Sequence, residues 1–126
     1  MLDAGALQAL ERRPLRLLVD LRRAHELGAP IRIPAGALAQ SWRGGARNAV
    51  LARLLKQPCT VVQIDERSAK TIGEFIASLR FDERAKPDIV DAHVALLARL
   101  TRSLVWTSDP AHMARYQVDP NMIRRL

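Results

Sequence analysis

The sequence predicts an α/β fold, a three-layer α/β/α sandwich with a central, mostly parallel sheet. Two observations lead to this prediction. Short segments of strand character alternate along the chain with amphipathic segments of helix character. Such alternation favours parallel strands, because each intervening helix returns the chain to the same end of the sheet. The length of 126 residues fits one domain, so residues 1–126 are expected to fold as a single unit.

The strands are expected in four short segments. Met1 and Leu2 indicate the remnant of a first strand, which we expect to be truncated because only these two residues precede Asp3. Residues 30–33 are interpreted as an extended segment. Residues 59–64 are rich in β-branched side chains and residues 104–107 form a further short run, so both predict strands.

The helices are predicted from apolar periodicity and from capping signals. They are expected over residues 6–12, 14–27, 35–42, 46–56, 65–79 and 88–102, and one more begins at Asp109-Pro110. The helix over residues 88–102 is apolar on nearly every face from Ile89 to Ala98, which indicates burial against the sheet and against a second helix or subunit. The charged segment 81–87 is expected to be a mobile loop.

Composition narrows the class of protein. Apolar residues make up 48% and charged residues 26%, which is typical of a soluble globular domain. The longest stretch without a charged residue, residues 33–42, is too short to cross a membrane, so we expect no membrane association. Cys59 is the single cysteine and zinc-ligand spacing is lacking. The single cysteine, the lack of zinc-ligand spacing and the charged N-terminal region together predict a cytoplasmic protein.

The charge balance favours acidic partners. Lys and Arg number 20 and Asp and Glu number 13, so the net charge is +7. A charge of this sign and size is expected of a protein that binds a polyanion such as RNA. The alternative is that arginine serves only as a helix-surface residue. The charge alone leaves both interpretations open.

Four aspartates are expected at one edge of the predicted sheet. Asp3 follows the first strand, Asp88 and Asp91 begin the helix over residues 88–102, and Asp109 follows the strand over residues 104–107. In a parallel sheet the strand ends and the helix starts share the edge at which ligands bind. Each aspartate alone fits an ordinary helix N-cap. Together they favour a cation that offsets their repulsion, and oxygen ligands indicate Mg²⁺ or Mn²⁺ and phosphodiester chemistry.

Four segments, in the order in which they occur along the chain, are similar to segments of a known protein family. They are LDAGAL (residues 2–7), IPAGALAQSWRGG (residues 33–45), DIVDAHVALLA (residues 88–98) and VWTSDP (residues 105–110). In sequence and spacing they resemble the PIN-domain family, in particular ribonucleases of the VapC toxin type. The resemblance implies a divalent-metal-dependent endoribonuclease that is the toxin of a toxin–antitoxin module. It also implies RNA as substrate, a cognate antitoxin protein and a homodimer.

The resemblance assigns roles to individual residues. Asp3, Asp91 and Asp109 match the catalytic, metal-binding aspartates, and Asp88 would be an accessory ligand or a cap. Thr107 and Ser108 match small hydroxyl residues of the last motif, which would contact substrate or a metal-bound water.

This sequence departs from the family pattern at two positions. Gln40 stands where many members have a glutamate, so it can hold a metal-bound water but adds no charge, which favours a single or weakly bound ion. His112 stands near a position that is often acidic. It lies one helical turn beyond Asp109 and could contact the site, but an exposed residue of a first helical turn is the favoured interpretation.

Several other residues have both a functional and a structural interpretation. Arg43 is a candidate for binding an RNA phosphate or an antitoxin carboxylate, or is a solvated charge at a helix end. Trp42 is expected to pack in the core or at a helix end, and His93 is expected to be a core histidine. Arg124 and Arg125 would contact RNA from a mobile terminus.

Two other functional classes compete with the nuclease. A PIN-fold module that binds RNA or a protein partner without cleavage is favoured by Gln40 and by the truncated first strand. A phospho-acceptor receiver domain shares the layered architecture. It is disfavoured because no obvious lysine follows a fourth strand to pair with an acyl phosphate.

Overall fold

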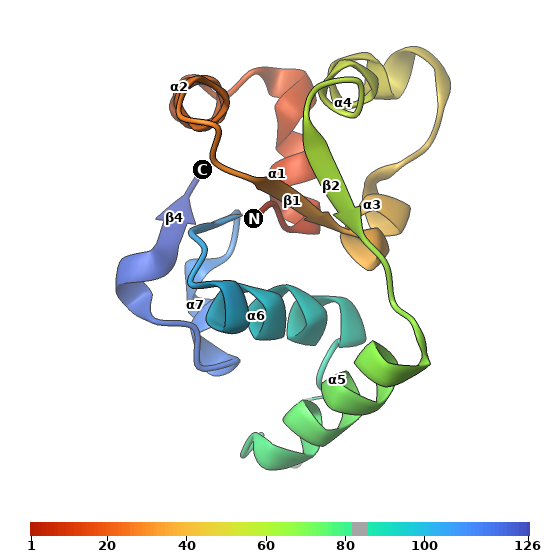
Figure 1. Ribbon diagram of the computed structural model, residues 1–126, viewed down its shortest axis with the longest axis vertical. Coiled ribbons are helices and arrows are strands. Elements are labelled where there is room, and N and C mark those ends of the chain that lie inside the picture. The colour runs from red at the N-terminus through yellow and green to blue at the C-terminus, as the bar shows by residue number, and fades with distance from the viewer. Residues whose placement is uncertain (82–85) are drawn as a thin grey trace.

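The computed structural model describes residues 1–81 and 86–126 as a mixed α/β structure (Figure 1). The centre of the expected charged loop, residues 82–85, lies outside the described residues. The α-helices are α1 (Ala4–Ala9), α2 (Leu15–Glu26), α3 (Ala35–Ser41), α4 (Ala49–Leu54), α5 (Glu66–Ser78), α6 (Ile89–Thr101) and α7 (Pro110–Arg115). The strands are β1 (Ile31–Pro34), β2 (Cys59–Val62), β3 (Val105–Thr107) and β4 (Ile123–Arg125). Three 3₁₀ turns are η1 (Leu10–Arg12), η2 (Gly45–Asn48) and η3 (Pro120–Met122).

The strands form two parallel pairs. In one pair β1 lies beside β2, with Ile33 opposite Val61. In the other pair β3 lies beside β4, with Trp106 opposite Arg124. The expected parallel pairing is therefore confirmed for the strands of both pairs.

The first residues of the chain lie between these two pairs. Leu2 makes a parallel bridge to Trp106, and its N–H donates to Arg32 O at 3.1 Å. The Trp106 N–H donates to Met1 O at 3.0 Å, and the Asp3 N–H donates to Trp106 O at 3.2 Å. Backbone hydrogen bonds thus run from β2 through β1 and the first residues to β3 and β4. The expected short first strand is present as this bridge.

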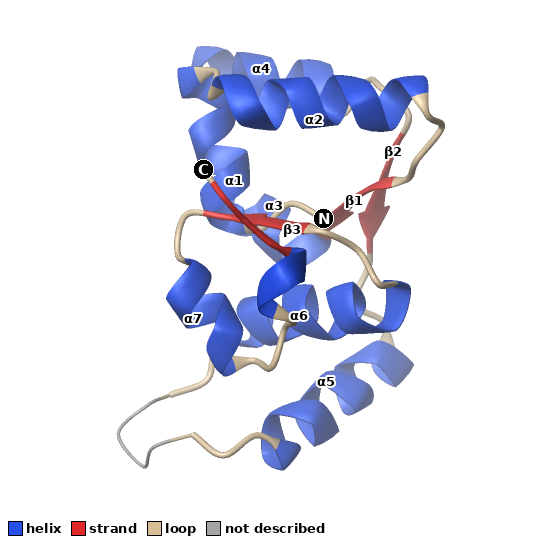
Figure 2. Ribbon diagram, turned by 90° about the vertical axis from the view of Figure 1, so that its left-hand side faces the viewer, coloured by secondary structure: helices blue, strands red, loops and turns tan. Residues whose placement is uncertain are grey.

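Helices lie on both sides of the strands. Figure 2 shows α2 and α4 on one side and α5, α6 and α7 on the other. On α6 the buried residues include Ala92, Ala95 and Ala98, whose small side chains allow close packing. This agrees with the burial expected for that helix. The core also contains large, fully buried side chains, among them Leu2, Leu7, Leu17, Ile33, Leu51 and Val105.

Polar side chains fix several helix starts. At α5 the Ser68 N–H donates to Asp65 Oδ1 at 2.7 Å, and the Asp65 N–H donates to Ser68 Oγ at 2.8 Å, which is a capping box. The start of α4 is capped from a distance, because Glu11 accepts from the N–H groups of Val50 and Leu51. Glu11 therefore ties η1 to α4, a role that the sequence did not indicate.

Some sequence predictions were wrong in detail. The helix expected over residues 46–56 is a 3₁₀ turn followed by a shorter α4, because Gly44 and Gly45 have positive φ angles of 75° and 61° and set a turn there. Trp42 is 42% exposed instead of packed in the core, since its backbone leaves the helix in an extended conformation. Arg124 and Arg125 lie in β4 and do not form a loose tail, because that strand pairs with β3. Within residues 1–81 and 86–126, no helix is long and apolar enough to cross a membrane.

Candidate functional site

Asp3 lies buried where the first strand passes into α1. It is the N-cap of that helix, and the Ala6 N–H donates to Asp3 Oδ1 at 2.6 Å. Burial raises the pKa of the Asp3 carboxyl above its ordinary value. A hydrogen bond with the Thr107 side chain and the bond from Ala6 act in the opposite direction, and the negative charge of Asp91 adds to the increase. Asp3 is therefore a buried carboxyl group within the field of a second one.

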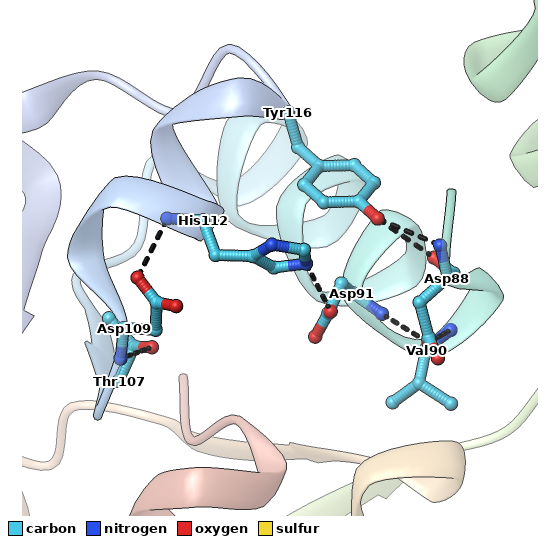
Figure 3. Close-up of polar contacts among 7 residues, drawn as sticks. All are labelled: Asp88, Val90, Asp91, Thr107, Asp109, His112 and Tyr116. Carbon is cyan, nitrogen blue, oxygen red and sulfur yellow. Dashed lines mark hydrogen bonds and ion pairs between the residues drawn. The ribbon is translucent and has the colours of Figure 1, made fainter. Parts of the chain in front are cut away.

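Asp91 lies in the first turn of α6 and is half-buried. Burial raises the pKa of its carboxyl, and the charges of Asp88 and Asp109 raise it further. His112 lowers that pKa, because its Nε2 lies 2.9 Å from Asp91 Oδ2. Figure 3 shows the His112 ring between α7 and α6, with its nitrogen directed at Asp91.

Asp109 is exposed and follows β3. It is the N-cap of α7, with the His112 N–H donating to Asp109 Oδ1 at 2.9 Å. Its own N–H donates to Thr107 Oγ1 at 3.0 Å. Thr107 is buried, and its side chain also lowers the pKa of Asp3, so this residue lies beside both the first and the last aspartate of the candidate site.

The three aspartates therefore share one neighbourhood. The charge of Asp91 acts on Asp3, and the charge of Asp109 acts on Asp91. In Figure 3 the carboxylates of Asp91 and Asp109 face the same space between α6 and α7. Residues from three distant parts of the chain thus influence one another in two pairs, Asp3 with Asp91 and Asp91 with Asp109.

Close packing of α1 against the end of β3 supports this arrangement. A Cβ atom built on Gly5 would overlap Ser108 Oγ. Only glycine therefore fits at this position unless the serine moves. Ser108 itself is exposed beside Asp109.

Asp88 caps α6. It accepts from the N–H groups of Val90 at 2.7 Å and Asp91 at 3.2 Å, and its own N–H donates to the Tyr116 hydroxyl at 2.8 Å (Figure 3). Of the two roles left open for Asp88, the geometry shows the cap. Its charge still reaches Asp91 and raises the pKa of that carboxyl.

Of the two interpretations of His112, the structure supports contact with the candidate site over a simple exposed residue. Its ring bonds Asp91, and it packs edge-on against the buried Tyr116 with 5.5 Å between the ring centroids. The packing of α7 against α6 decides this orientation. The spacing of Asp109, His112 and Tyr116 on one short helix is the sequence signal that could have indicated it.

Within the described residues, no hydrogen bond joins Gln40 or Arg43 to the aspartates. Gln40 is exposed in the last turn of α3, and its side chain makes no hydrogen bond within the described residues. Arg43 Nη1 donates to the backbone oxygens of Trp42 at 2.8 Å and Ala39 at 3.4 Å. Its guanidinium therefore binds the end of α3, in keeping with the structural interpretation of this residue.

The expected three-ligand metal site is not assembled in the described part of the chain. Across residues 1–81 and 86–126, no three Asp, Glu, His or Cys side chains lie close enough to hold one ion together. The donor chemistry nevertheless fits a hard cation, since carboxylates and hydroxyls surround the space. Mg²⁺ needs only one or two protein carboxylates when waters and substrate phosphates complete its coordination.

Comparisons of the chain with family models, with curated proteins and with solved structures find no match.

Proposed function

We propose that this chain is a Mg²⁺- or Mn²⁺-dependent endoribonuclease with the three-layer PIN-domain architecture. The observation that carries the proposal is the position of the three aspartates: Asp3 and Asp109 cap the helices that follow the first strand and β3, and Asp91 lies in the first turn of α6. Like charges that lie close together repel one another, and a bound cation offsets this repulsion. A cation between two of these carboxylates removes that repulsion.

The protein's own groups would hold such a site in place. The bond from Ala6 fixes Asp3, and the bond from His112 fixes one oxygen of Asp109 and leaves the other oxygen for a ligand. The buried Thr107 hydroxyl accepts from the Asp109 N–H and would help to hold the start of α7 in place. When bound, Mg²⁺ or Mn²⁺ supplies a positive charge that polarises a phosphoryl oxygen and favours ionisation of water.

The surface charge suits an RNA substrate. With a net charge of +7, the protein attracts a polyanion before any specific contact forms. The proposal extends to the biological setting that the sequence resemblance implies: a toxin that acts as a homodimer and is inhibited by a cognate antitoxin protein. In this setting Asp88 and Gln40 would support the ion through water, and Ser108 and Arg43 would face the RNA.

A second candidate is a module of the same fold that binds RNA or a protein without cleaving it. The specific observation that favours it is the contact of His112 with Asp91, which provides the carboxylate with a partner other than a metal ion. Exposed, uncharged Gln40 adds no further negative charge. The two candidates differ in turnover alone, so a cleavage assay separates them.

The test is cleavage of end-labelled structured RNA by purified protein in Mn²⁺. We expect cleavage that stops in EDTA and falls at least a hundredfold in Asp91→Asn, a loss of the size typical for removal of a group that stabilises the transition state (about 10²–10³). Asp65→Asn is the matched control, because Asp65 is an exposed helix cap at the start of α5. RNA binding without cleavage would instead establish the binding module.

A further inference from the structure

We propose that a groove along α2 binds an acidic, amphipathic segment of a partner protein. Two adjoining hollows form this groove, with volumes of about 650 Å³ and 430 Å³. Asp20, Trp106 and Arg124 line both hollows, so they join into one groove, here called the α2 groove. Figure 2 shows α2 crossing the strands on the side opposite α6.

The apolar part of the α2 groove is unusually exposed. Leu15 is 76% exposed, Val19 is 53% exposed and Leu27 is 71% exposed, and all three line the groove. Leu15 and Val19 are one helical turn apart and line one hollow, and Leu27, the residue after the end of α2, lines the other. Leu104, which is 39% exposed, adds to this surface from the segment before β3. Contiguous exposed apolar side chains of this kind mark an interaction site.

The charged lining of the α2 groove is almost wholly positive. Its arginines come from α2, from β1, from the turn before β3 and from β4, and within the described residues Asp20 is the one acidic residue of the lining. The arginines are Arg16, Arg23, Arg32, Arg102, Arg124 and Arg125. None of them belongs to an ion pair of the described residues. Carboxylates of a partner would supply the missing negative charge and bind these guanidinium groups in a bidentate manner.

The side chains favour a protein over RNA as the occupant. A single-stranded nucleic acid binds on exposed aromatic faces, whereas Trp106 in this groove is only 7% exposed. Leu15, Val19 and Leu27 are aliphatic and suit the apolar face of a peptide. A segment with leucine-type residues on one side and carboxylates on the other therefore matches both the apolar surface and the arginines.

The α2 groove is separate from the aspartate site. Its lining includes Ile31 and Leu104, at the beginnings of β1 and β3, whereas Asp109 follows the end of β3. The proposal consequently does not depend on the nuclease. Asp91→Asn is expected to leave the groove unchanged.

The test measures fluorescence anisotropy of a labelled synthetic peptide that carries leucine on one helical face and glutamate on the other. A second peptide with lysine in place of each glutamate serves as the charge control. We expect the glutamate peptide to bind and the lysine peptide not to bind. In Leu15→Gln/Val19→Gln the dissociation constant should rise about tenfold, since burial of one exposed apolar side chain contributes that much or more.

Matched variants make the result specific. Leu100→Gln changes a leucine on α6 that is 70% exposed and lies outside the groove, so it should bind the peptide like the wild type. Arg124→Gln should weaken binding and reduce its salt dependence, whereas Arg53→Gln on α4 should not. Circular dichroism checks that each variant is folded.

Three outcomes would overturn the proposal. The first is that the glutamate and lysine peptides bind equally well, or that neither peptide binds. The second is equal loss of peptide binding in Leu15→Gln/Val19→Gln and in Leu100→Gln. The third is an oligouridine RNA that binds wild-type protein but loses affinity in Leu15→Gln/Val19→Gln, because the groove would then be a nucleic-acid site.

Discussion

His112 Nε2 lies 2.9 Å from Asp91 Oδ2, while the backbone N–H of the same residue donates to Asp109. One residue of α7 therefore connects two carboxylates that we propose as metal ligands. A cation that binds Asp91 through Oδ2 has to displace the His112 ring. His112 thus competes with the ion, and its removal is informative.

His112→Ala is expected to bind Mn²⁺ about fivefold more tightly than the wild type. The reason is that the ion no longer displaces a hydrogen bond with a net value of about 1 kcal/mol. Isothermal titration calorimetry measures the affinity, and His25→Ala, at an exposed position on α2, is the control. Weaker binding in His112→Ala would show that the imidazole is itself a ligand.

Asp3→Asn is expected to raise the melting temperature at neutral pH. The pKa of Asp3 is raised from 3.8 in the folded protein, so the folded state binds the proton more tightly than the unfolded state. Asp3 therefore stabilises the fold below its ordinary pKa, and this contribution is lost as pH rises through the raised value. Asparagine keeps an oxygen for the bond from Ala6 but carries no charge. Melting curves across this pH range, without divalent ions, should show that the melting temperature of Asp3→Asn exceeds that of the wild type by more as the pH rises. A higher melting temperature seen only at acidic pH would contradict the raised pKa of Asp3.

His93→Leu is expected to stabilise the protein by about 1–3 kcal/mol, the cost of a buried polar group that lacks a partner. His93 is 1% exposed, and neither ring nitrogen has a hydrogen-bond partner in the described part of the structure. Burial lowers the pKa of this histidine from 6.5, so the wild type loses stability as pH falls through 6.5 toward the lowered value. Urea unfolding at both ends of this range measures the effect. If His25→Leu were to remove the same acid dependence, His93 would not be its source.

Gly5→Ala is expected to reduce the free energy of unfolding by about 1–3 kcal/mol, because the new methyl group overlaps Ser108 Oγ. Gly73→Ala on α5 is the matched control, since open space surrounds that position, and it should stabilise by about 0.5–1 kcal/mol. The double variant Gly5→Ala/Ser108→Gly should recover most of the loss. No recovery would mean that the close approach of α1 to β3 is not the cause.

Local signals in the sequence predicted much of the fold. The caps Asp65, Asp88 and Asp109 were expected and are present, because a cap depends on residues within one turn of the helix start. Parallel pairing followed from the order of the elements. By contrast, β4 was missed, since Ile123 is its only apolar residue and the strand exists through pairing with β3.

The candidate site was also predictable in part, where local sequence signals determine the position of a residue. Asp3 and Asp109 follow strands, and this position alone directs them to one edge of a parallel sheet. The bond between His112 and Asp91 depends on how α7 packs against α6, which short-range patterns do not encode. The sequence left Arg43 open as a phosphate ligand or a helix-end charge, and its guanidinium reaches the backbone oxygens of its own helix end.

A Mn²⁺ titration of the wild type, Asp91→Asn and Asp65→Asn by calorimetry tests the central claim most directly. The account predicts one saturable site in the wild type and in Asp65→Asn, with affinity in Asp91→Asn reduced at least tenfold, as for loss of a charged partner (about 1.5–3 kcal/mol). Equal Mn²⁺ affinity in all three proteins, or no saturable site in any of them, would contradict it.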